Sequence, residues 1–572
     1  MKWLFRPSIL VLLSAGLALS ATALVLWPKP LEDRALPLAV PEGDQEIAWL
    51  YTATSYGPWE RFIKGLETVV ERLHGTAPDL GIETHRQSAF PAETTAVPEV
   101  VLSSKRVAGG LRFRWYKLTS NQKTRDWVKA LLERRPAPLA IIGGSSSDLG
   151  IDLARCLQRE TADRDVGPAA PLLLLTTATA DDDPNSPEQP LAGIYGGRTF
   201  RFCFTNRQMA EAAVDFIWGR NDLRPDSDPV WLTYWNDDPY SKDLQQRYLD
   251  ALRRPAAQGA AQDWARWASY ATVGGFPLDG VGITWGQFRL GIPAYSTYIP
   301  YSVGTFGRPN RWEVEVAGQL MEKKLREYPN QRRPLLVLPA ATQPARRFLR
   351  ALARFAPMEA RRFVVVSGDS IAFNTLFRDR NFAWPIQDLP FSLVGFFHRN
   401  PVDPAAGFPL ADATRSAEAN DTTSRAGTED LLLYVDLLDA VIQASICNGP
   451  NSTMAKVPGS GEDLKRRLSQ AHWSKALGRV TFDPADSPLF DANGNRHSGT
   501  GEHIVTLRPI VKGREVMPAA NIAVWAWRAG NGTGARSWIP QALLPVHYDG
   551  YYGQETEGEI GANSREKEVR SP

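Results

Sequence analysis

The sequence predicts an α/β protein of two lobes, each a doubly wound parallel sheet, joined by crossovers. At 572 residues the chain is too long for a single hydrophobic core. Short apolar runs, such as 171–175 and 334–338, alternate with segments of helical spacing. Strands that are apolar throughout are typical of parallel sheets covered by helices on both faces, so more than one such sheet is expected.

The expected elements follow one another in a regular order. In the first half, strands at 46–53, 111–118, 139–142 and 171–175 are interspersed with helices at 59–73, 124–133, 149–157 and 209–218. In the second half, strands at 229–235, 334–338, 362–366 and 391–397 are interspersed with helices at 240–252 and 345–355. Short strands at 479–482 and 503–507 follow, and a charged tail begins near residue 554.

The N-terminus predicts export. Lys2 and Arg6 precede an uncharged, mainly apolar run at 7–27, as in a signal segment. The run is close to the length that spans a bilayer, so residues 1–30 are expected to be either a cleaved signal peptide or an uncleaved anchor. Residues 31–45, rich in proline and charge, are expected to be a linker. Both alternatives place the protein in the periplasm or outside the cytoplasm.

The composition argues against several classes of partner. The formal net charge of +2 gives no field that would attract nucleic acid or acidic lipid, so membrane contact is expected only through the N-terminal segment. Cys156, Cys203 and Cys447 form no CxxC pair, which argues against a zinc cluster and a disulfide scaffold. Three buried thiols are expected, with one disulfide and a leftover thiol as the alternative.

Catalytic and metal signatures do not appear in the sequence. It contains no GxSxG, HExxH or GxxxxGK[S/T] motif, and its seven histidines are scattered without ligand spacing. The oxygen side chains of Asp491, Asn493 and Asn495 alternate as in calcium loops, but the later acidic ligand is missing and a turn is favoured. The sequence therefore predicts a protein that is not an enzyme and holds no metal or cofactor.

Hydroxyl side chains gather where several predicted strands end. Gly143-Gly-Ser-Ser-Ser-Asp148 joins a buried strand to a helix, and Leu175-Thr-Thr-Ala-Thr-Ala180 closes the next strand. Thr52-Ala-Thr-Ser-Tyr-Gly57 follows the first strand in the same topological position. In an open α/β sheet, ligands bind beyond the carboxyl ends of the strands, and a helix N-terminus with serines is suited to an anion. Helix capping by Ser147 or Asp148 is the alternative role of the first loop.

These loops resemble a known family in their order and spacing. Ser55-Tyr-Gly57, the Gly143 and Leu175 loops, Thr199-Phe-Arg-Phe-Cys-Phe-Thr205 and Asn236-Asp-Asp-Pro-Tyr240 resemble the leucine/branched-chain amino-acid-binding proteins, which are type I periplasmic solute-binding proteins. The runs 364–369, 392–397 and 478–483 resemble later strands of that family, and the similarity extends over about 46–507.

The resemblance implies a ligand site shared by the two lobes. In the first lobe, Ser145 and Ser146 with Thr177 and Thr179 would hold a carboxylate and an amino group, and Tyr56 would pack on the ligand side chain. In the second lobe, Tyr240 and Asp369 would contribute, the acid pairing with an ammonium. Two departures weaken the second-lobe half: residues 340–342 read Ala-Ala-Thr where the family often has Gly-Gly-Tyr, and 255–332 replaces a short connection.

Together these patterns predict a domain organisation and a function. The first lobe is expected at 46–225 and again at 401–510, the second at 226–400 with an insertion at 255–332, and a C-terminal extension at 511–572. The insertion is expected to cover the cleft, to dock a partner or to extend the second core. The predicted function is binding of an amino acid or related carboxylate for ABC-type uptake or sensing, with a membrane permease or a signalling protein as partner. A nucleotide- or sugar-dependent transferase of similar architecture is the alternative.

Overall fold

The computed structural model describes residues 35–52, 57–75, 77–85, 97–105, 107–119, 122–164, 166–183, 186–227, 229–235, 238–253, 311–340, 342–370, 389–399, 428–446, 455–470, 502–529 and 536–547. Predictions on the N-terminal segment, Tyr56, Cys447, the Asp491 turn, the 478–483 strand, the tail and most of the 255–332 insertion lie outside these residues.

The first lobe is built on a seven-stranded sheet in the order β10-β7-β6-β1-β5-β3-β2. Its strands are β1 (Gln45–Thr52), β2 (Leu80–His85), β3 (Glu99–Ser104), β5 (Leu111–Leu118), β6 (Ala140–Gly143), β7 (Leu172–Leu175) and β10 (Thr199–Arg201). The five strands from β10 to β5 are parallel, whereas β3 and β2 continue the sheet antiparallel. Two two-stranded sheets accompany it, β4 (Val107–Ala108) with β15 (Ala455–Lys456) and β8 (Asp182–Asp183) with β9 (Ser186–Pro190).

Helices cover both faces of the first sheet, which is why its strands are apolar throughout. Ile47 and Trp49 of β1 point into a core with α2 (Gly57–Leu73), α13 (Thr428–Ser445) and α14 (Gly461–Gln470). The alternate residues Ala48 and Leu50 point into the opposite core, with α3 (Thr124–Glu133), α4 (Ser147–Ala162) and α5 (Leu191–Ile194). Each strand therefore supplies two cores, because successive side chains leave opposite faces of a sheet.

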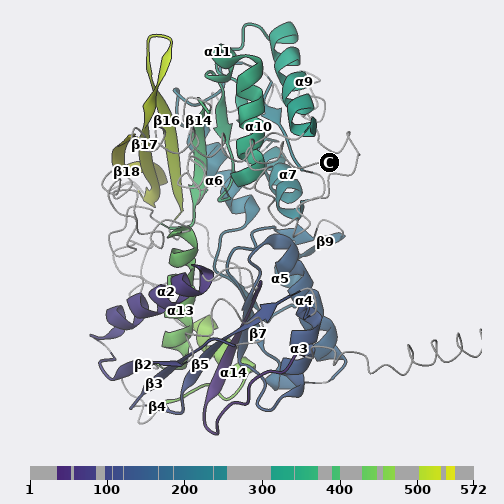
Figure 1. Cartoon of the computed structure of the whole chain (residues 1–572), viewed down its shortest axis with the longest axis vertical. Coiled ribbons are helices and arrows are strands. Elements are labelled where there is room, and N and C mark those ends of the chain that lie inside the picture. Colours follow the sequence, from purple (N-terminus) through teal and green to yellow (C-terminus); the bar gives the residue numbers. More distant parts are fainter. Residues whose placement is uncertain are drawn as a thin grey trace, which may run out of the picture.

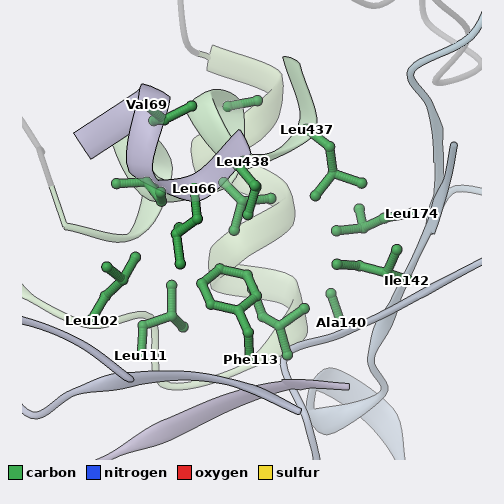
Figure 2. Close-up of a cluster of buried hydrophobic side chains, with 14 of the residues drawn as sticks. Leu66, Val69, Leu102, Leu111, Phe113, Ala140, Ile142, Leu174, Leu437 and Leu438 are labelled. Atoms are coloured by element: carbon green, nitrogen blue, oxygen red, sulfur yellow. The ribbon is translucent and has the colours of Figure 1, made fainter. Parts of the chain in front are cut away.

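Helices α2 and α13, far apart in the sequence, lie side by side over the first sheet (Figure 1). Figure 2 shows Leu66 of α2 and Leu438 of α13 directed toward Phe113 of β5, with Ile142 and Leu174 from the neighbouring strands beside them. The chain thus returns to the first lobe after building part of the second.

The second lobe contains a seven-stranded sheet in the order β11-β12-β13-β14-β16-β17-β18. Its strands are β11 (Trp231–Leu232), β12 (Leu335–Val337), β13 (Val364–Val366), β14 (Ser392–Phe397), β16 (His503–Lys512), β17 (Glu515–Ala529) and β18 (Arg536–His547). The first four are parallel, and the last three extend the sheet antiparallel. The helices of this lobe are α6 (Asn206–Trp218), α7 (Pro239–Arg253), α9 (Arg311–Glu327), α10 (Thr342–Phe355) and α11 (Pro357–Ala360).

Both faces of this second sheet are also covered. Leu336 and Val365 point into a core with α9 and α10, whereas Leu335 and Val364 point into a core with α6 and α7. The prediction of two doubly wound lobes with parallel-rich sheets is therefore confirmed. Figure 1 shows the two lobes one above the other along the long axis of the molecule.

The lobe boundaries differ from the predicted ones in two places. Helix α6 packs in the core of the second lobe, so the first crossover lies at 202–205 and not near Asp226. The pattern predicts residues up to 510 in the first lobe, whereas β16 pairs with β14 in the second sheet. An antiparallel hairpin carries too little sequence signal to show which sheet edge it joins, because the edges of both lobes can accept it.

Two further observations concern the described part of the chain. Cys156 and Cys203 are buried, as expected. Among the helices described, none combines the length and the apolar character needed to span a bilayer.

Candidate functional site

The loop between β6 and α4 turns sharply at the carboxyl end of the first sheet. Gly144 has φ +69°, a left-handed conformation that favours glycine, and a Cβ there would lie 2.7 Å from the Leu175 side chain. Ser146 is the N-cap of α4, but its side chain makes no capping hydrogen bond. The first turn of α4 presents main-chain N–H groups and the positive end of the helix dipole. The loop therefore leaves Ser145 and Ser146 half-buried beside a helix N-terminus.

Ser145 lies on the wall of a small pocket between strands β1 and β5 and the start of α4. The pocket is lined by Leu50, Tyr51, Leu118, Thr124, Gly144, Ser145, Leu149 and Leu153. It has room for roughly a single water molecule. Strands β1 and β6 are adjacent although they are not consecutive, and this reversal of strand order is where open α/β sheets bind ligands.

The loop after β7 is tied to the first loop by three hydrogen bonds. The Thr177 hydroxyl donates to the carbonyl oxygen of Gly144 at 3.2 Å, and the Thr177 N–H to the same oxygen at 3.4 Å. The hydroxyl of Ser147 accepts from the N–H of Ala180 at 3.1 Å. The structure thus brings into contact the two loops that carry Ser145, Ser146, Thr177 and Thr179. Tyr56 lies outside the described residues.

Thr179 has a buried side chain, 1% exposed, whose Oγ1 has no hydrogen-bond partner among the described residues. Its carbonyl oxygen accepts from Asn206 N–H at 2.8 Å and from the Arg201 guanidinium at 3.3 Å. An unpaired buried hydroxyl is unfavourable, so this group is ready to accept a new partner. Thr179 therefore differs from Thr177, whose hydroxyl proton is already used between the loops.

In the second lobe, Asp369 lies just beyond the carboxyl end of β13. Tyr240 of α7 donates its hydroxyl to Asp369 Oδ1 at 3.1 Å, and the Ser370 hydroxyl donates to the Tyr240 oxygen at 2.8 Å. Burial, together with the charge of Asp369, raises the pKa of Tyr240 well above its ordinary value, so the phenol keeps its proton. Tyr240 and Asp369, both predicted as site residues, are thus joined directly.

A histidine that the sequence pattern did not single out completes this second-lobe group. His398 follows β14 and is 1% exposed, and its Nε2 lies 2.9 Å from Asp369 Oδ2. Its Nδ1 accepts the main-chain N–H of Phe204 at 3.0 Å. A signal was present, because His398 stands at the end of an apolar run predicted as a strand, the same topological position as the serine and threonine loops.

The two lobes contact each other through a cluster of charged side chains that follows Thr179 in the first lobe and Tyr240 in the second. The N–H of Asp181, after β7, donates to Asp243 Oδ2 on α7 at 2.8 Å. Arg247 of α7 is hydrogen-bonded to Asp182 and to Asp243, and it lies 3.5 Å from Asp181. Burial raises the pKa of Asp243 to about 6, and the nearby charge of Asp181 acts in the same direction. Side chains of opposite charge from both lobes are therefore interleaved at this boundary.

The N-terminus of α7 also lies near that of α4. Asp238 accepts the N–H of Tyr240 at 3.1 Å. The pKa of Asp238 is raised to about 6, mainly by burial; the negative charge of Asp148 on α4 acts in the same direction, whereas the hydrogen bond from the Tyr240 N–H opposes it. Helices α4 and α7 are in contact, so the loops at the carboxyl ends of the two sheets lie close to each other here. We call Ser145, Ser146, Thr177 and Thr179 the serine–threonine group. Among the described residues, no hydrogen bond joins this group directly to Asp369.

Comparisons with known proteins give the following results. No protein-family model and no curated protein sequence matches the chain. Solved structures with similarity include an ABC transporter substrate-binding protein from Desulfitobacterium hafniense in complex with Leu, at 14% identity and TM-score 0.43, covering 83% of this chain and 100% of that one. Another is the leucine-, isoleucine-, valine-, threonine- and alanine-binding protein from Brucella ovis, at 10% identity and TM-score 0.39, covering 89% and 97%. A third is a solute-binding protein from R. palustris in complex with 4-hydroxybenzoate, at 9% identity and TM-score 0.44, covering 83% and 95%.

Proposed function

We propose that this chain is an extracytoplasmic solute-binding protein whose two lobes close on a small polar ligand, an amino acid or a related carboxylate. The observation that carries the proposal is the complementary character of the two loop groups. The first lobe offers hydroxyls at a helix N-terminus, and the second offers the carboxylate of Asp369. A zwitterion needs donors at one end and an anion at the other when it leaves water.

The first-lobe group is suited to the carboxylate of the ligand. Ser145 and Ser146 stand at the start of the 16-residue helix α4, and the side chain of Ser146 is not used as a cap. Helix N-terminal N–H groups and nearby hydroxyls stabilise a bound anion. The unpaired Oγ1 of Thr179 supports a role for this residue in holding a second polar atom of the same ligand.

The second-lobe group is suited to a cation. Both oxygens of Asp369 receive a hydrogen bond, one from Tyr240 and one from His398. Among the described residues, no lysine or arginine forms an ion pair with Asp369. Within the described part of the chain this mostly buried carboxylate thus has no counter-charge, which is costly, and a ligand ammonium group would supply that charge. Asp369 is 12% exposed, so it remains within reach of a ligand.

Closure follows from a ligand that touches both lobes. Its contacts with the serine–threonine group and with Asp369 exist together only when the lobes approach each other, and this difference in binding energy drives the motion. The chain passes between the lobes at 202–205, again between β14 and α13, and again between α14 and β16. These connections are where a hinge would bend. The proposed activity is binding alone, without catalysis.

The cellular role is inferred from the N-terminal sequence. A basic start followed by an apolar run supports export, with the protein delivering its solute to a membrane permease or reporting it to a signalling partner. The intact mass of the protein isolated from cells tests this part. Loss of the first 20 to 30 residues, about the length of a signal peptide, supports a freely diffusing receptor, and a full-length mass supports an anchored one.

A ligand screen tests the binding proposal. We expect at least one of the twenty standard amino acids to raise the midpoint of thermal unfolding. Analogues of that amino acid that lack the amino group or the carboxylate group should raise the midpoint less. Asp369→Asn should abolish the preference for the form with the amino group, whereas the control Glu322→Gln, on an exposed part of α9, should keep it. Stabilisation by none of these compounds, or turnover of a nucleotide sugar, would contradict the proposal.

A further inference from the structure

His398 connects the first crossover to the carboxylate of Asp369. Its Nδ1 receives the main-chain N–H of Phe204, in the crossover at 202–205, and its Nε2 contacts Asp369. The side chain is 1% exposed. The imidazole therefore joins the backbone that passes between the lobes to the acid of the second lobe.

The two contacts determine which ring nitrogen carries the proton. A main-chain N–H can only donate, so Nδ1 of His398 must offer its lone pair to Phe204. In a neutral imidazole the other nitrogen then carries the hydrogen. Nε2–H therefore donates to Asp369 Oδ2, at 2.9 Å. Asp369 Oδ2 is therefore the acceptor in this hydrogen bond.

Aromatic neighbours fix the plane of the imidazole. The ring of Phe204 is stacked on it, with centroids 5.8 Å apart and planes 11° apart. The ring of Phe396 meets it edge-on, at 5.5 Å and 73°. Rotation of the imidazole would break both contacts as well as both hydrogen bonds, so its donor is held toward Asp369.

We propose that His398 is a positioning residue: as the neutral tautomer protonated at Nε2, it holds the carboxylate of Asp369 in place for a cationic ligand group and ties that carboxylate to the first crossover. The proposal rests on the proposed function for its ligand, but the tautomer and the bridge do not depend on it. A change in the crossover when the lobes move shifts the Phe204 N–H, and the rigid ring carries that shift to Asp369.

Two amide substitutions separate the two halves of the bridge. The side-chain nitrogen of glutamine occupies nearly the place of Nε2, so His398→Gln keeps a donor to Asp369 but loses the acceptor for Phe204. The oxygen of asparagine occupies nearly the place of Nδ1, so His398→Asn keeps the acceptor and loses the donor. Both variants place a neutral polar amide in the same site, which makes each the control for the other.

Nitrogen NMR of the unliganded wild-type protein tests the tautomer without any variant. We expect the His398 imidazole to show a protonated Nε2 and an unprotonated Nδ1 that accepts a hydrogen bond. A proton on Nδ1 would overturn the proposal, whatever the protein binds.

Calorimetric titration tests the positioning role. The ligands are L-leucine, L-glutamate, L-lysine and 4-methylpentanoate, which is the leucine analogue without an amino group. We expect His398→Asn to lose about tenfold or more in affinity for the amino acid that binds wild type best, since a hydrogen bond to a charged group is removed. His398→Gln should lose less than about threefold, and binding of 4-methylpentanoate should change in neither variant. A loss in His398→Gln with none in His398→Asn would overturn the proposal. If none of the amino acids binds wild type, the proposed function fails, and the NMR result decides the tautomer by itself.

Discussion

The main-chain N–H of Asp181, in the first lobe, donates a hydrogen bond of 2.8 Å to the carboxylate of Asp243, in the second. The same carboxylate also accepts from the side chain of Asn206 at 2.8 Å and from Arg247 at 3.1 Å. The Asp243 carboxylate therefore accepts hydrogen bonds from the first lobe, through Asp181, and from α6 and α7 of the second lobe, through Asn206 and Arg247. This group of residues therefore joins the two lobes by hydrogen bonds.

Arg247→Gln should destabilise the protein strongly. The guanidinium, 9% exposed, interacts with the carboxylates of Asp181, Asp182 and Asp243. Its removal takes away the positive charge that these mostly buried carboxylates share, at a cost of about 3–5 kcal/mol. Differential scanning calorimetry should show a fall of several degrees in the unfolding midpoint. Arg326→Gln, in an exposed ion pair on α9, is the control and should change stability by less than about 0.5 kcal/mol. Equal shifts in the two variants would contradict the assigned role of Arg247.

The stability difference between wild type and Asp238→Asn should depend on pH. Burial raises the pKa of Asp238 from 3.8 to about 6, so the folded state binds its proton more tightly than the unfolded state. The contribution of this group to stability is thus fully present below pH 3.8 and is lost as pH rises through about 6. Asparagine keeps an oxygen for the Tyr240 N–H but does not titrate.

Thermal midpoints of the two proteins between pH 4 and 7 check this. Wild type should lose stability relative to Asp238→Asn as pH rises, by at most about 3 kcal/mol. A constant difference across the range, or one that grows in favour of wild type toward pH 7, would contradict the environment described for Asp238.

Ser145 and Ser147, on either side of Ser146 in the first-lobe loop, should respond differently to alanine. Ser147→Ala leaves the buried N–H of Ala180 without its acceptor, which should lower the stability by about 1–3 kcal/mol. Ser145→Ala removes a half-buried hydroxyl on the pocket wall and should leave stability within about 0.5 kcal/mol of wild type. Binding of an amino acid found in the screen should weaken about tenfold in Ser145→Ala. Unchanged affinity there would exclude Ser145 from the ligand site.

Leu438→Ala should show that α13 belongs to the core of the first lobe. Leu438 is fully buried and lies beside Leu66 and Phe113 (Figure 2). Replacing it leaves a cavity, which costs about 2–5 kcal/mol. Met358→Ala, whose side chain is 55% exposed on the second lobe, is the control with little expected effect. Chemical unfolding followed by circular dichroism measures both, and an unaffected Leu438→Ala protein would contradict the packing of α13.

The sequence by itself determined the class of the fold and the position of several loops. Apolar runs such as Leu172–Leu175 predict strands buried on both faces, because local composition reports burial directly. The loops at Gly144 and Thr177 follow from the same pattern, since the end of a strand is visible where its apolar run stops. Their convergence required only the rule that neighbouring parallel strands end at one edge of a sheet.

Only the tertiary structure decided which distant segments meet. The contacts of His398 with Phe204 and Asp369, and of Asp243 with Asp181, join residues from 29 to 194 positions apart. No local pattern of hydrophobicity or turn residues encodes these pairings, because those of His398 depend on how elements pack around the second lobe, and that of Asp243 with Asp181 depends on how the two lobes meet. The same reason applies to α6 and β16, because the sequence shows that these elements form but not which lobe offers the surface that buries them.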